Sequence, residues 1–291
     1  MTINGNKTVS EALKEAVEIL SKDKGFTSPR LDCEILLAFV LNCTRMDLIF
    51  CRDKQLSDEQ QSMFFAYIQR RLKREPISYI TNEKEFMSLS FFVQKGVLTP
   101  RPETELLVEY IVNQYKTVSE PYILDLCTGS GAIAVSLAHY LKNSYITAVD
   151  KYEICLEVAK KNAQKHGCLE RIKWMKADVL KQLDIQEKFH CIVSNPPYIK
   201  SRVLSSLPDD VKCYEPEYAL DGGQDGLLFY REITSFAAEH ILPGGKLVYE
   251  LGYDQGIDVK NIIKEAHSFH TIEIIKDYAG LDRMVIATKE D

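Results

Sequence analysis

The sequence predicts an α/β fold in which a mostly parallel sheet carries helices on both faces, with a small helical domain before it. From residue 122 onward, apolar runs typical of buried strands alternate with helical patterns. A two-glycine turn follows the first of these runs, and Asn-Pro-Pro-Tyr follows a later one. The expected strands are 122–127, 145–149, 172–176, 190–194, 246–251, 271–276 and 284–288, and the expected helices between them are 131–141, 152–165, 226–240 and 256–267.

The composition is that of a globular protein with one large and one small domain, since 45% of the 291 residues are hydrophobic and 27% are charged. The expected divisions are 1–83 for a helical domain, 84–97 for a linking hairpin and 98–291 for the α/β domain. The net charge of −6 argues against a protein that holds nucleic acid by phosphate neutralisation alone. No stable nucleic-acid binding is therefore expected.

Neither a targeting segment nor a metal site is expected. The start of the chain, Met1–Gly5, lacks a basic and apolar signal region, and no run approaches the roughly 18 apolar residues of a membrane span. The eight cysteines include no C-x-x-C pair, and the six histidines include no H-E-x-x-H pattern. The cysteines are expected to be small buried hydrophobic residues, and the protein is expected to be cytoplasmic with no membrane partner.

The helical domain carries capping signals but no catalytic pattern. Helices are expected to start after Thr8, Ser28 and Ser57, and Glu11 and Gln60 complete capping boxes with the first and the last of these. The second helix is expected to turn Leu31, Ile35, Leu36 and Phe39 inward. A basic run at Arg70–Arg74 is better explained as a solvated helix end than as a nucleic-acid contact. We expect a small bundle that recruits a partner.

The segment between the two domains predicts a hairpin and then a fixed loop. Residues 86–97 partly alternate and are expected to turn at Gln94–Gly96. In the next segment, prolines on both sides of Arg101 exclude a helix interior. Glu103 and Glu105 then lie near the start of an expected helix. Capping of that helix and lining of an active site are both open for these carboxylates.

The first expected strand runs into the turn Thr128-Gly129-Ser130-Gly131. Such a turn lets a ligand approach the backbone and points helix N–H groups at it. It is not the dinucleotide fingerprint, because a further glycine is replaced by Ala134, and no G-K-[ST] phosphate loop is present. A plain connection between strand and helix is an equal alternative for the turn alone.

Carboxylates follow the next two expected strands. Asp150 ends the second strand, where an acidic residue is well placed to accept from ribose hydroxyls, so the spacing favours a nucleoside cofactor. Asp178 follows the third strand, where it can accept from an adenine amino group or be an ordinary loop aspartate. Because ligands bind beyond the carboxyl ends of parallel strands, Gly129, Asp150, Asp178 and Asn195 are expected to meet at one edge.

The apolar run that ends at Ser194 stops at Asn195-Pro196-Pro197-Tyr198, since prolines cannot continue a ladder. The Asn195 carboxamide oxygen and the proline carbonyls are acceptors, and Tyr198 adds a flat aromatic face. This combination suits a planar group that bears –NH2, although a simple proline turn also explains it. The long insert 199–226 beside it is a candidate substrate lid.

Three segments carry a resemblance to a known family. Asp125–Ala134, Asn195–Tyr198 and the Pro100–Glu105 loop resemble the HemK/PrmC family of protein-(glutamine-N5) methyltransferases that act on peptide chain release factors. The resemblance covers nearly the whole chain. Asn-Pro-Pro-Tyr is shared with adenine-N6 methyltransferases, whereas Pro-Arg-Pro-Glu-Thr-Glu favours the release-factor enzymes over relatives that methylate a ribosomal protein. This chain departs from the family at Cys127, which is usually glycine, and at His190, which is usually acidic.

The resemblance implies a Rossmann-like, seven-stranded class I methyltransferase sheet and S-adenosylmethionine as the cofactor. Its implied reaction is methyl transfer to the N5 amide nitrogen of the glutamine in the Gly-Gly-Gln motif of a release factor, which is the expected partner. The implied cofactor-binding residues are Cys127, Thr128, Gly129, Ser130, Gly131, Asp150, Asp178, Val179 and Asn195. The implied catalytic residues are Asn195, Pro196 and Tyr198. The implied substrate-binding residues are Asn195, Pro196, Pro197, Tyr198, Arg101 and Glu103.

Three alternatives remain at this point. An adenine-N6 methyltransferase of DNA or RNA would hold a flipped base in the same tetrad, but the acidic balance argues against it. A ribosomal-protein glutamine methyltransferase would share the chemistry. A methyltransferase fold that only binds partners is disfavoured, because Gly129, Gly131, Asp150 and Asn195 are all present.

Overall fold

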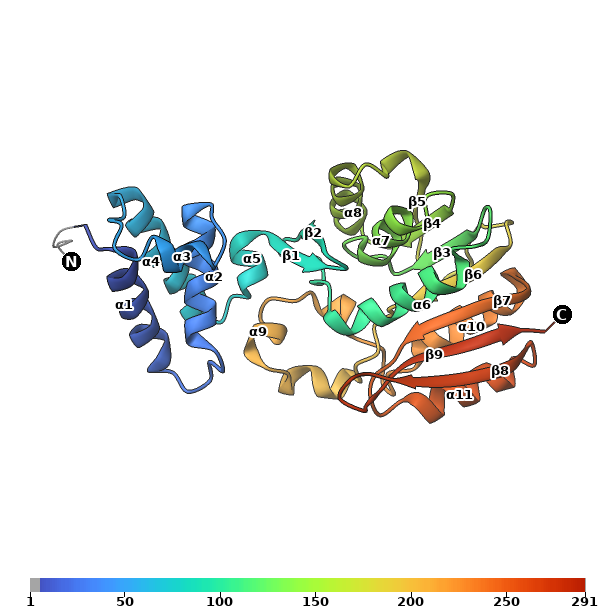
Figure 1. Cartoon of the computed structure of the whole chain (residues 1–291). Helices are drawn as coiled ribbons and strands as arrows, with labels where there is room; N and C mark the ends of the chain where they lie inside the picture. Colours follow the sequence, from blue (N-terminus) through green and yellow to red (C-terminus); the bar gives the residue numbers. More distant parts are fainter. Residues whose placement is uncertain (1–5, 291) are drawn as a thin grey trace. The chain divides into compact units, whose positions relative to one another are not determined.

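The structure is a computed structural model that describes residues 6–290. The segment Met1–Gly5, in which no signal region was expected, lies outside the described residues, as does Asp291. The chain divides between Asn82 and Glu83 into two compact units, which are coloured along the sequence in Figure 1. Within residues 6–290, none of the helices combines the length and the apolar character needed to span a membrane.

The first unit is helical. Its helices are α1 (Val9–Ser21), α2 (Pro29–Leu41), α3 (Asp47–Phe50), α4 (Asp58–Leu72) and α5 (Ile77–Thr81). The capping boxes at Thr8 and Ser57 are formed, which confirms both predictions, whereas the Ser28 side chain makes no capping hydrogen bond and Pro29 starts the helix instead.

The buried face of α2 differs from the prediction. Cys33, Leu36, Leu37 and Ala38 are buried, but Leu31 and Phe39 are 39% and 41% exposed. This helix is apolar on most of its circumference, so periodicity alone does not select the stripe that its neighbours α1, α4 and α5 cover. Leu31 and Phe39 are therefore surface residues, and their expected inward orientation is wrong.

The basic run at the end of α4 is neutralised within the first unit. Arg70 pairs with Glu75 at 2.5 Å, Arg71 pairs with Asp32 at 2.8 Å, and Arg74 pairs with Asp23. Guanidinium groups already engaged by carboxylates are poorly available to phosphates. The run thus supports the helical bundle.

The second unit contains, within the described residues, a seven-stranded sheet of order β5-β4-β3-β6-β7-β9-β8. Its strands are β3 (Tyr122–Leu126), β4 (Tyr145–Asp150), β5 (Ile172–Lys176), β6 (Phe189–Ser194), β7 (Ile241–Glu250), β8 (Phe269–Lys276) and β9 (Asp282–Lys289). All neighbours pair in parallel except β9, which is antiparallel to β7 and β8. This mixed sheet confirms the predicted fold class.

Helices cover both faces of the sheet (Figure 1). The covering helices on one face are α6 (Glu105–Tyr115), α7 (Ala132–Tyr140) and α8 (Glu153–Lys165), and those on the other are α10 (Leu228–His240) and α11 (Gly256–Glu265). Short helices η2 (Leu169–Arg171), η3 (Ser201–Ser206), α9 (Asp209–Lys212) and η4 (Glu217–Ala219) lie in the connections. Apolar side chains fill each helix layer, so the strand ends are held in fixed positions.

Strand β7 begins five residues earlier than the predicted start at 246. Ile241 pairs with Phe189, and regular pairing resumes only at Lys246 with Cys191. Pro243 lies in the intervening segment, where its missing N–H costs no ladder hydrogen bond. The sequence pattern detected the regular part of the strand and missed the irregular start.

The predicted hairpin exists, but its turn is elsewhere. Strand β1 (Glu83–Phe86) pairs with β2 (Leu89–Phe92), so the chain turns at Met87 and Ser88 rather than at Gln94–Gly96. Both turn residues have positive φ, at 50° and 55°, as a two-residue hairpin turn of the right twist requires. The Glu105 carboxylate accepts from the Met87 N–H at 2.7 Å and so holds this turn against α6.

One buried asparagine joins the hairpin, α8 and the glycine turn. Asn162 is fully buried, and its Oδ1 accepts from the Phe92 N–H at 2.7 Å. Its Nδ2 donates to the carbonyls of Phe92 and Ser130 at 3.0 and 2.9 Å. Because Ser130 belongs to the Thr128–Gly131 turn, a helix side chain fixes the position of that turn.

We expect Asn162→Leu to lower the free energy of unfolding by about 3 kcal/mol, because three backbone polar groups would be left buried without partners. Urea denaturation followed by circular dichroism measures this change. Asn113→Leu, on the exposed side of α6, is the matched control and should change stability by less than about 0.5 kcal/mol. A loss below about 1 kcal/mol for Asn162→Leu would contradict the role of Asn162.

Candidate active site

The carboxyl ends of the parallel strands bring the predicted residues together. Cys127, Gly129, Asp150, Asp178, Val179, Asn195 and Pro197 line one cavity of about 100 Å³, with Tyr152, Tyr218 and Phe229 as aromatic walls. A second cavity of about 40 Å³ shares Cys127, Gly129 and Asn195 and adds Arg101, Thr128 and Ser130. The predicted residues Pro196, Tyr198, Gly131 and Glu103 line neither cavity.

The glycine turn is held from below by the carboxylate of Asp125. The Thr128 hydroxyl donates to Asp125 Oδ2 at 2.6 Å, and the Ala134 N–H donates to the same oxygen at 3.2 Å. Asp125 Oδ1 is buried and has no hydrogen-bond partner among the described residues. Burial raises the pKa of Asp125 to about 7, against the hydrogen bonds from Thr128 and Ala134, which lower it.

Cys127, where the resemblance led us to expect glycine, has an unfavourable backbone conformation. Its φ is +62°, in the left-handed region where a side chain other than that of glycine costs roughly 1–2 kcal/mol. Gly131 also has positive φ, and a Cβ there would lie 2.9 Å from the Ala159 Cβ. Gly131 therefore allows close packing of the turn on α8. The other departure, His190, lies at the amino end of β6, where Nδ1 accepts from the Tyr122 N–H at 3.0 Å, away from the cavity.

Asp150 supports the turn and lines the cavity. Its Oδ2 accepts from the Gly129 N–H and its Oδ1 from the Tyr152 N–H, both at 2.9 Å. Burial raises the pKa of Asp150, and these hydrogen bonds lower it. Asp178 is half-buried at the cavity wall, where it pairs with Lys151 at 3.1 Å and accepts from the Leu180 N–H. Burial acts to raise the pKa of Asp178, but these contacts bring it below its usual value.

The Asn195 carboxamide has its nitrogen engaged and its oxygen left as an acceptor. The Nδ2 group donates to the Thr104 hydroxyl at 3.1 Å. No hydrogen bond among the described residues uses Asn195 Oδ1 or the Pro196 carbonyl. Asn195 lines both cavities, whereas Pro196 and Pro197 are buried. The end of β6 therefore carries two unpaired acceptors, Asn195 Oδ1 and the Pro196 carbonyl.

Tyr198 is fixed at both its ends. The hydroxyl donates to Glu250 Oε1 at 3.3 Å, and the backbone carbonyl accepts from Gln255 Nε2 at 2.9 Å. Burial and the nearby Glu250 carboxylate raise the pKa of the Tyr198 phenol. A Cβ on Gly222 would lie 2.7 Å from the Tyr198 Cα, so the insert packs directly on the tetrad backbone.

The insert 199–226 is anchored at several points. Its base is closed by the backbone hydrogen bonds Ile199 N to Leu220 O and Gly222 N to Ile199 O, at 2.9 and 2.8 Å. Glu215 is buried and pairs with Arg101 at 3.1 Å. Tyr218 stacks on Tyr152 with ring centroids 3.6 Å apart. The insert is thus held at its base, at Glu215 and at Tyr218, and its role as a substrate lid stays a prediction.

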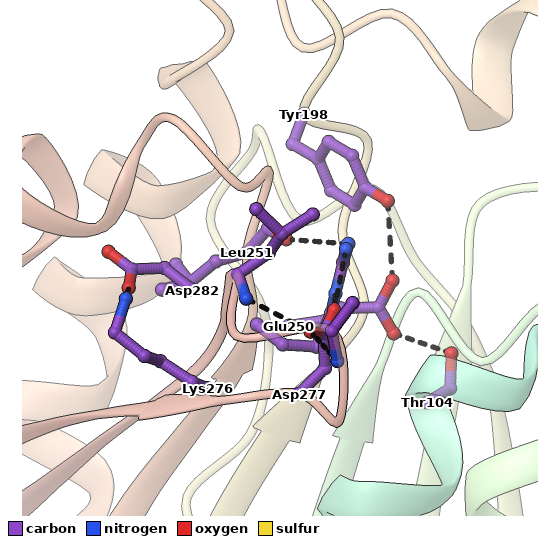
Figure 2. Close-up of polar contacts among 10 residues, drawn as sticks. Thr104, Tyr198, Glu250, Leu251, Lys276, Asp277 and Asp282 are labelled. Carbon is purple, nitrogen blue, oxygen red and sulfur yellow. Dashed lines mark hydrogen bonds and ion pairs between the residues drawn. The ribbon is translucent and has the colours of Figure 1, made fainter.

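Two residues near the tetrad were not assigned to the site from the sequence. Thr104 and Glu250 are buried, and Thr104 Oγ1 donates to Glu250 Oε2 at 2.5 Å. Figure 2 shows Glu250 between Thr104 and Tyr198, with a dashed contact to each. The sequence does hold a signal for Glu250, which was missed: a carboxylate inside the apolar run 246–251 is unusual for a buried strand. Thr104 carries no such signal, because threonine before a helix reads as a cap, yet its side chain makes no capping bond.

A wider hollow of about 870 Å³ lies at the opposite edge of the sheet. Its lining includes Tyr122, Tyr145 and Ile172, the first residues of β3, β4 and β5, and none of the predicted site residues. Ligands of open parallel sheets bind at the carboxyl edge, so this hollow is not the candidate site. Within residues 6–290, no three His, Cys, Asp or Glu side chains gather closely enough to hold a metal ion.

Comparison with known proteins agrees with this geometry. Residues 11–81 match the PrmC N-terminal domain, and residues 100–207 match the methyltransferase small domain. A release factor glutamine methyltransferase of Clostridium acetobutylicum is 42% identical over 97% of this chain and 98% of its own length. The enzyme of the same name from Clostridium botulinum is 40% identical over 97% and 99% of the two chains.

The fold is also that of a methyltransferase of known structure. A methyltransferase from Pyrococcus furiosus superposes with a TM-score of 0.51 at 19% identity, over 81% of this chain and 100% of its own. The sheet order, the glycine turn and the matched methyltransferase domain define a class I methyltransferase that uses S-adenosylmethionine. With identities near 40% over almost the whole length, the chain belongs to the PrmC family of release factor glutamine methyltransferases.

Proposed function

We propose that this enzyme methylates the side-chain amide nitrogen of the glutamine in the Gly-Gly-Gln motif of a peptide chain release factor. The observation that carries the proposal is the pair of unpaired acceptors, Asn195 Oδ1 and the Pro196 carbonyl, beside Tyr198. A primary amide has two N–H groups, so it matches two acceptors held by a rigid backbone. Because release factors act in translation, the proposed location is the cytoplasm.

The site works by positioning. An amide nitrogen is a weak nucleophile because its lone pair is delocalised, and no side chain of ordinary basicity removes its proton to a useful extent. Asn195 Oδ1 and the Pro196 carbonyl accept the two amide hydrogens, orient the nitrogen and stabilise positive charge that develops on it. After methyl transfer, the N-protonated amide is strongly acidic and loses one of these protons to water, which leaves the neutral N-methyl amide. Tyr198 packs on the amide plane. Arg101 and Glu103 lie on the η1 side (η1, Pro102–Thr104) of this site and are assigned to the protein substrate.

The lining residues fit S-adenosylmethionine. Asp150 offers a carboxylate for ribose hydroxyls, and Asp178 with Val179 offers polar and apolar surface for a purine. Cys127 and the turn Thr128–Gly131 bring backbone groups to the cavity wall without bulky side chains. When bound, S-adenosylmethionine supplies an electrophilic methyl group.

The first unit is proposed to recruit the release factor. Its α3 region exposes apolar side chains, with Met46 65%, Ile49 62% and Phe50 83% exposed. Clusters of large exposed apolar side chains are uncommon on monomeric proteins and often mark protein interaction surfaces. The unit contributes none of the residues that line the two cavities.

We expect Asp150→Ala to weaken cofactor binding roughly 10- to 100-fold, the loss of hydrogen bonds to a charged group. Calorimetry with S-adenosylhomocysteine measures it, and Glu153→Ala, an exposed carboxylate on α8, is the control. Replacing the cofactor by its 2′-deoxy or 3′-deoxy analogue should cost less affinity in Asp150→Ala than in wild type. The variant already lacks the carboxylate that would bind the missing hydroxyl. Fully additive losses for both analogues would reject the ribose assignment and leave only loop support.

For Asn195→Ala we expect single-turnover methyl transfer to fall on the order of 100- to 1000-fold while cofactor affinity changes little. Asn195→Asp keeps acceptor oxygens, so it should retain measurable activity where alanine does not. The rates are measured with saturating S-adenosylmethionine and a purified bacterial release factor. An alanine variant within a few-fold of wild type would remove Asn195 from the mechanism.

The recruitment proposal predicts that the double change Ile49→Ser and Phe50→Ser raises KM for the release factor by roughly 3- to 10-fold, as for the loss of apolar interface contacts. The kcat and the cofactor affinity should stay unchanged. Lys14→Ser, another exposed position of the first unit, is the control. Equal KM values for the double variant and wild type would refute recruitment through α3.

A further inference from the structure

Four side chains form a hydrogen-bonded chain behind the proposed acceptor site. Asn195 Nδ2 contacts Thr104 Oγ1 at 3.1 Å, Thr104 Oγ1 contacts Glu250 Oε2 at 2.5 Å, and Tyr198 Oη contacts Glu250 Oε1 at 3.3 Å. Figure 2 shows the last two of these contacts meeting at the Glu250 carboxylate. Both oxygens of one buried carboxylate are thus used to hold two residues of the same tetrad.

The direction of each hydrogen bond follows from the chemistry of the groups. An ionised carboxylate can only accept, so the Thr104 hydroxyl gives its single proton to Glu250. That hydroxyl then has only lone pairs left, and Asn195 must face it with its NH2 group. Asn195 Oδ1 is consequently left as the free acceptor of a side chain that lines both cavities. A carboxamide without such a partner has two orientations of similar shape, and only one presents an acceptor.

We propose that Glu250 is a positioning residue, which acts through the Thr104 hydroxyl to select the carboxamide orientation of Asn195 that can accept from the substrate amide. This inference rests on the proposed function of Asn195. Both carboxylate oxygens of Glu250 are engaged by the Thr104 and Tyr198 hydroxyls, so Glu250 supports these residues and is not assigned a contact with the reacting atoms. Its second oxygen fixes the Tyr198 hydroxyl, which couples the stacking residue to the same support.

The protonation of Glu250 reverses this arrangement. A protonated Glu250 can donate to the Thr104 hydroxyl, whose own proton is then free to turn toward Asn195 Oδ1. The net pKa of Glu250 is raised to about 7: burial is the main cause and Glu103 on η1 adds to it, while Thr104, Arg283 on β9 and Tyr198 act to lower it. Arg283 is itself paired with Asp277 at 3.1 Å. Because the ionised form is the active one, kcat should fall as the pH drops through about 7.

The test is a double-mutant cycle on the single-turnover rate, with saturating S-adenosylmethionine and a purified bacterial release factor. Thr104→Val removes the hydroxyl with little change of shape and should lower the rate by roughly 10-fold or more. Thr104→Ser restores the hydroxyl and should recover most of this loss. In the Asn195→Ala background, Thr104→Val should cost less than about 3-fold, because the two residues act as one unit. Thr234→Val removes a buried hydroxyl that contacts Tyr249 at 3.0 Å and is the control for the loss of a buried polar group.

Two further readouts separate positioning from general damage. Calorimetry should show cofactor affinity unchanged in Thr104→Val, and the ¹⁵N-labelled side-chain amide signal of Asn195, assigned with Asn195→Asp, should shift. Glu250→Gln cannot ionise, so its rate should lose the decline near pH 7 that wild type shows. If Thr104→Val does not fold, as judged by circular dichroism, Thr104→Ala and the Glu250→Gln pH profile carry the same test.

The results separate the positioning of Asn195 by Glu250 through Thr104, here called the relay, from the function on which it rests. If Asn195→Ala is inactive while Thr104→Val stays within about 3-fold of wild type, the relay is overturned and the proposed function stands. Additive losses, or an acid decline that persists in Glu250→Gln, also overturn it. If Asn195→Ala retains wild-type rates, both the function assigned to Asn195 and the relay fall together.

Discussion

The site depends on the abrupt end of β6, where two prolines follow Asn195 and neither can donate a backbone hydrogen bond. The sheet cannot continue through them, so the chain leaves it with Pro196 and Pro197 buried and with acceptors that no donor within residues 6–290 uses. Acceptors left unpaired inside a protein are normally costly, and here Asn195, which carries one of them, lines a cavity that a ligand can fill. In the proposed reaction, the substrate amide must reach the end of β6. The cofactor-binding loops therefore have to lie beside the same strand end.

A backbone exit of this kind needs support from parts of the chain that are distant in sequence. Buried polar side chains provide it: Asn162 ties the hairpin to the glycine turn, Gln255 holds the carbonyls of Tyr198 and Gly226, and Glu215 joins the insert to Arg101. Each is a residue whose polar groups are satisfied by one specific arrangement and by few others. Apolar packing gives the two helix layers their stability, and these polar contacts determine the positions of the loops at the catalytic edge.

Sequence patterns predicted what depends on local chemistry. The strands, the glycine turn and the end of β6 follow from apolar runs, glycine and proline, which act within a few residues, and the structure contains each of them. The hairpin turn at Met87–Ser88 escaped prediction because Glu105, Tyr140 and β-pairing select it in place of a local glycine. Leu31 and Phe39 escaped because their exposure depends on which stripe of α2 the other helices cover. Thr104 and Glu250 meet Asn195 only in the folded unit, across 91 and 55 positions of sequence, so no local pattern joins them.

A buried carboxylate such as Glu250 is an unfavourable choice for stability alone. Its raised pKa means that the folded state binds a proton more tightly than the unfolded chain, so its contribution to stability is lost as the pH rises from its ordinary value through about 7. Asp125, whose pKa is also raised to about 7 and whose Oδ1 has no partner among the described residues, behaves in the same way beneath the glycine turn. A neutral glutamine would avoid this cost, but its amide can itself donate and so leaves the direction of the hydrogen bonds undetermined. An ionised carboxylate accepts only, and that single property is what makes the orientation of Thr104, and through it of Asn195, unambiguous. The stability given up at neutral pH is thus consistent with the proposed reaction, in which no enzyme side chain acts as a general base and positioning makes a weak nucleophile react.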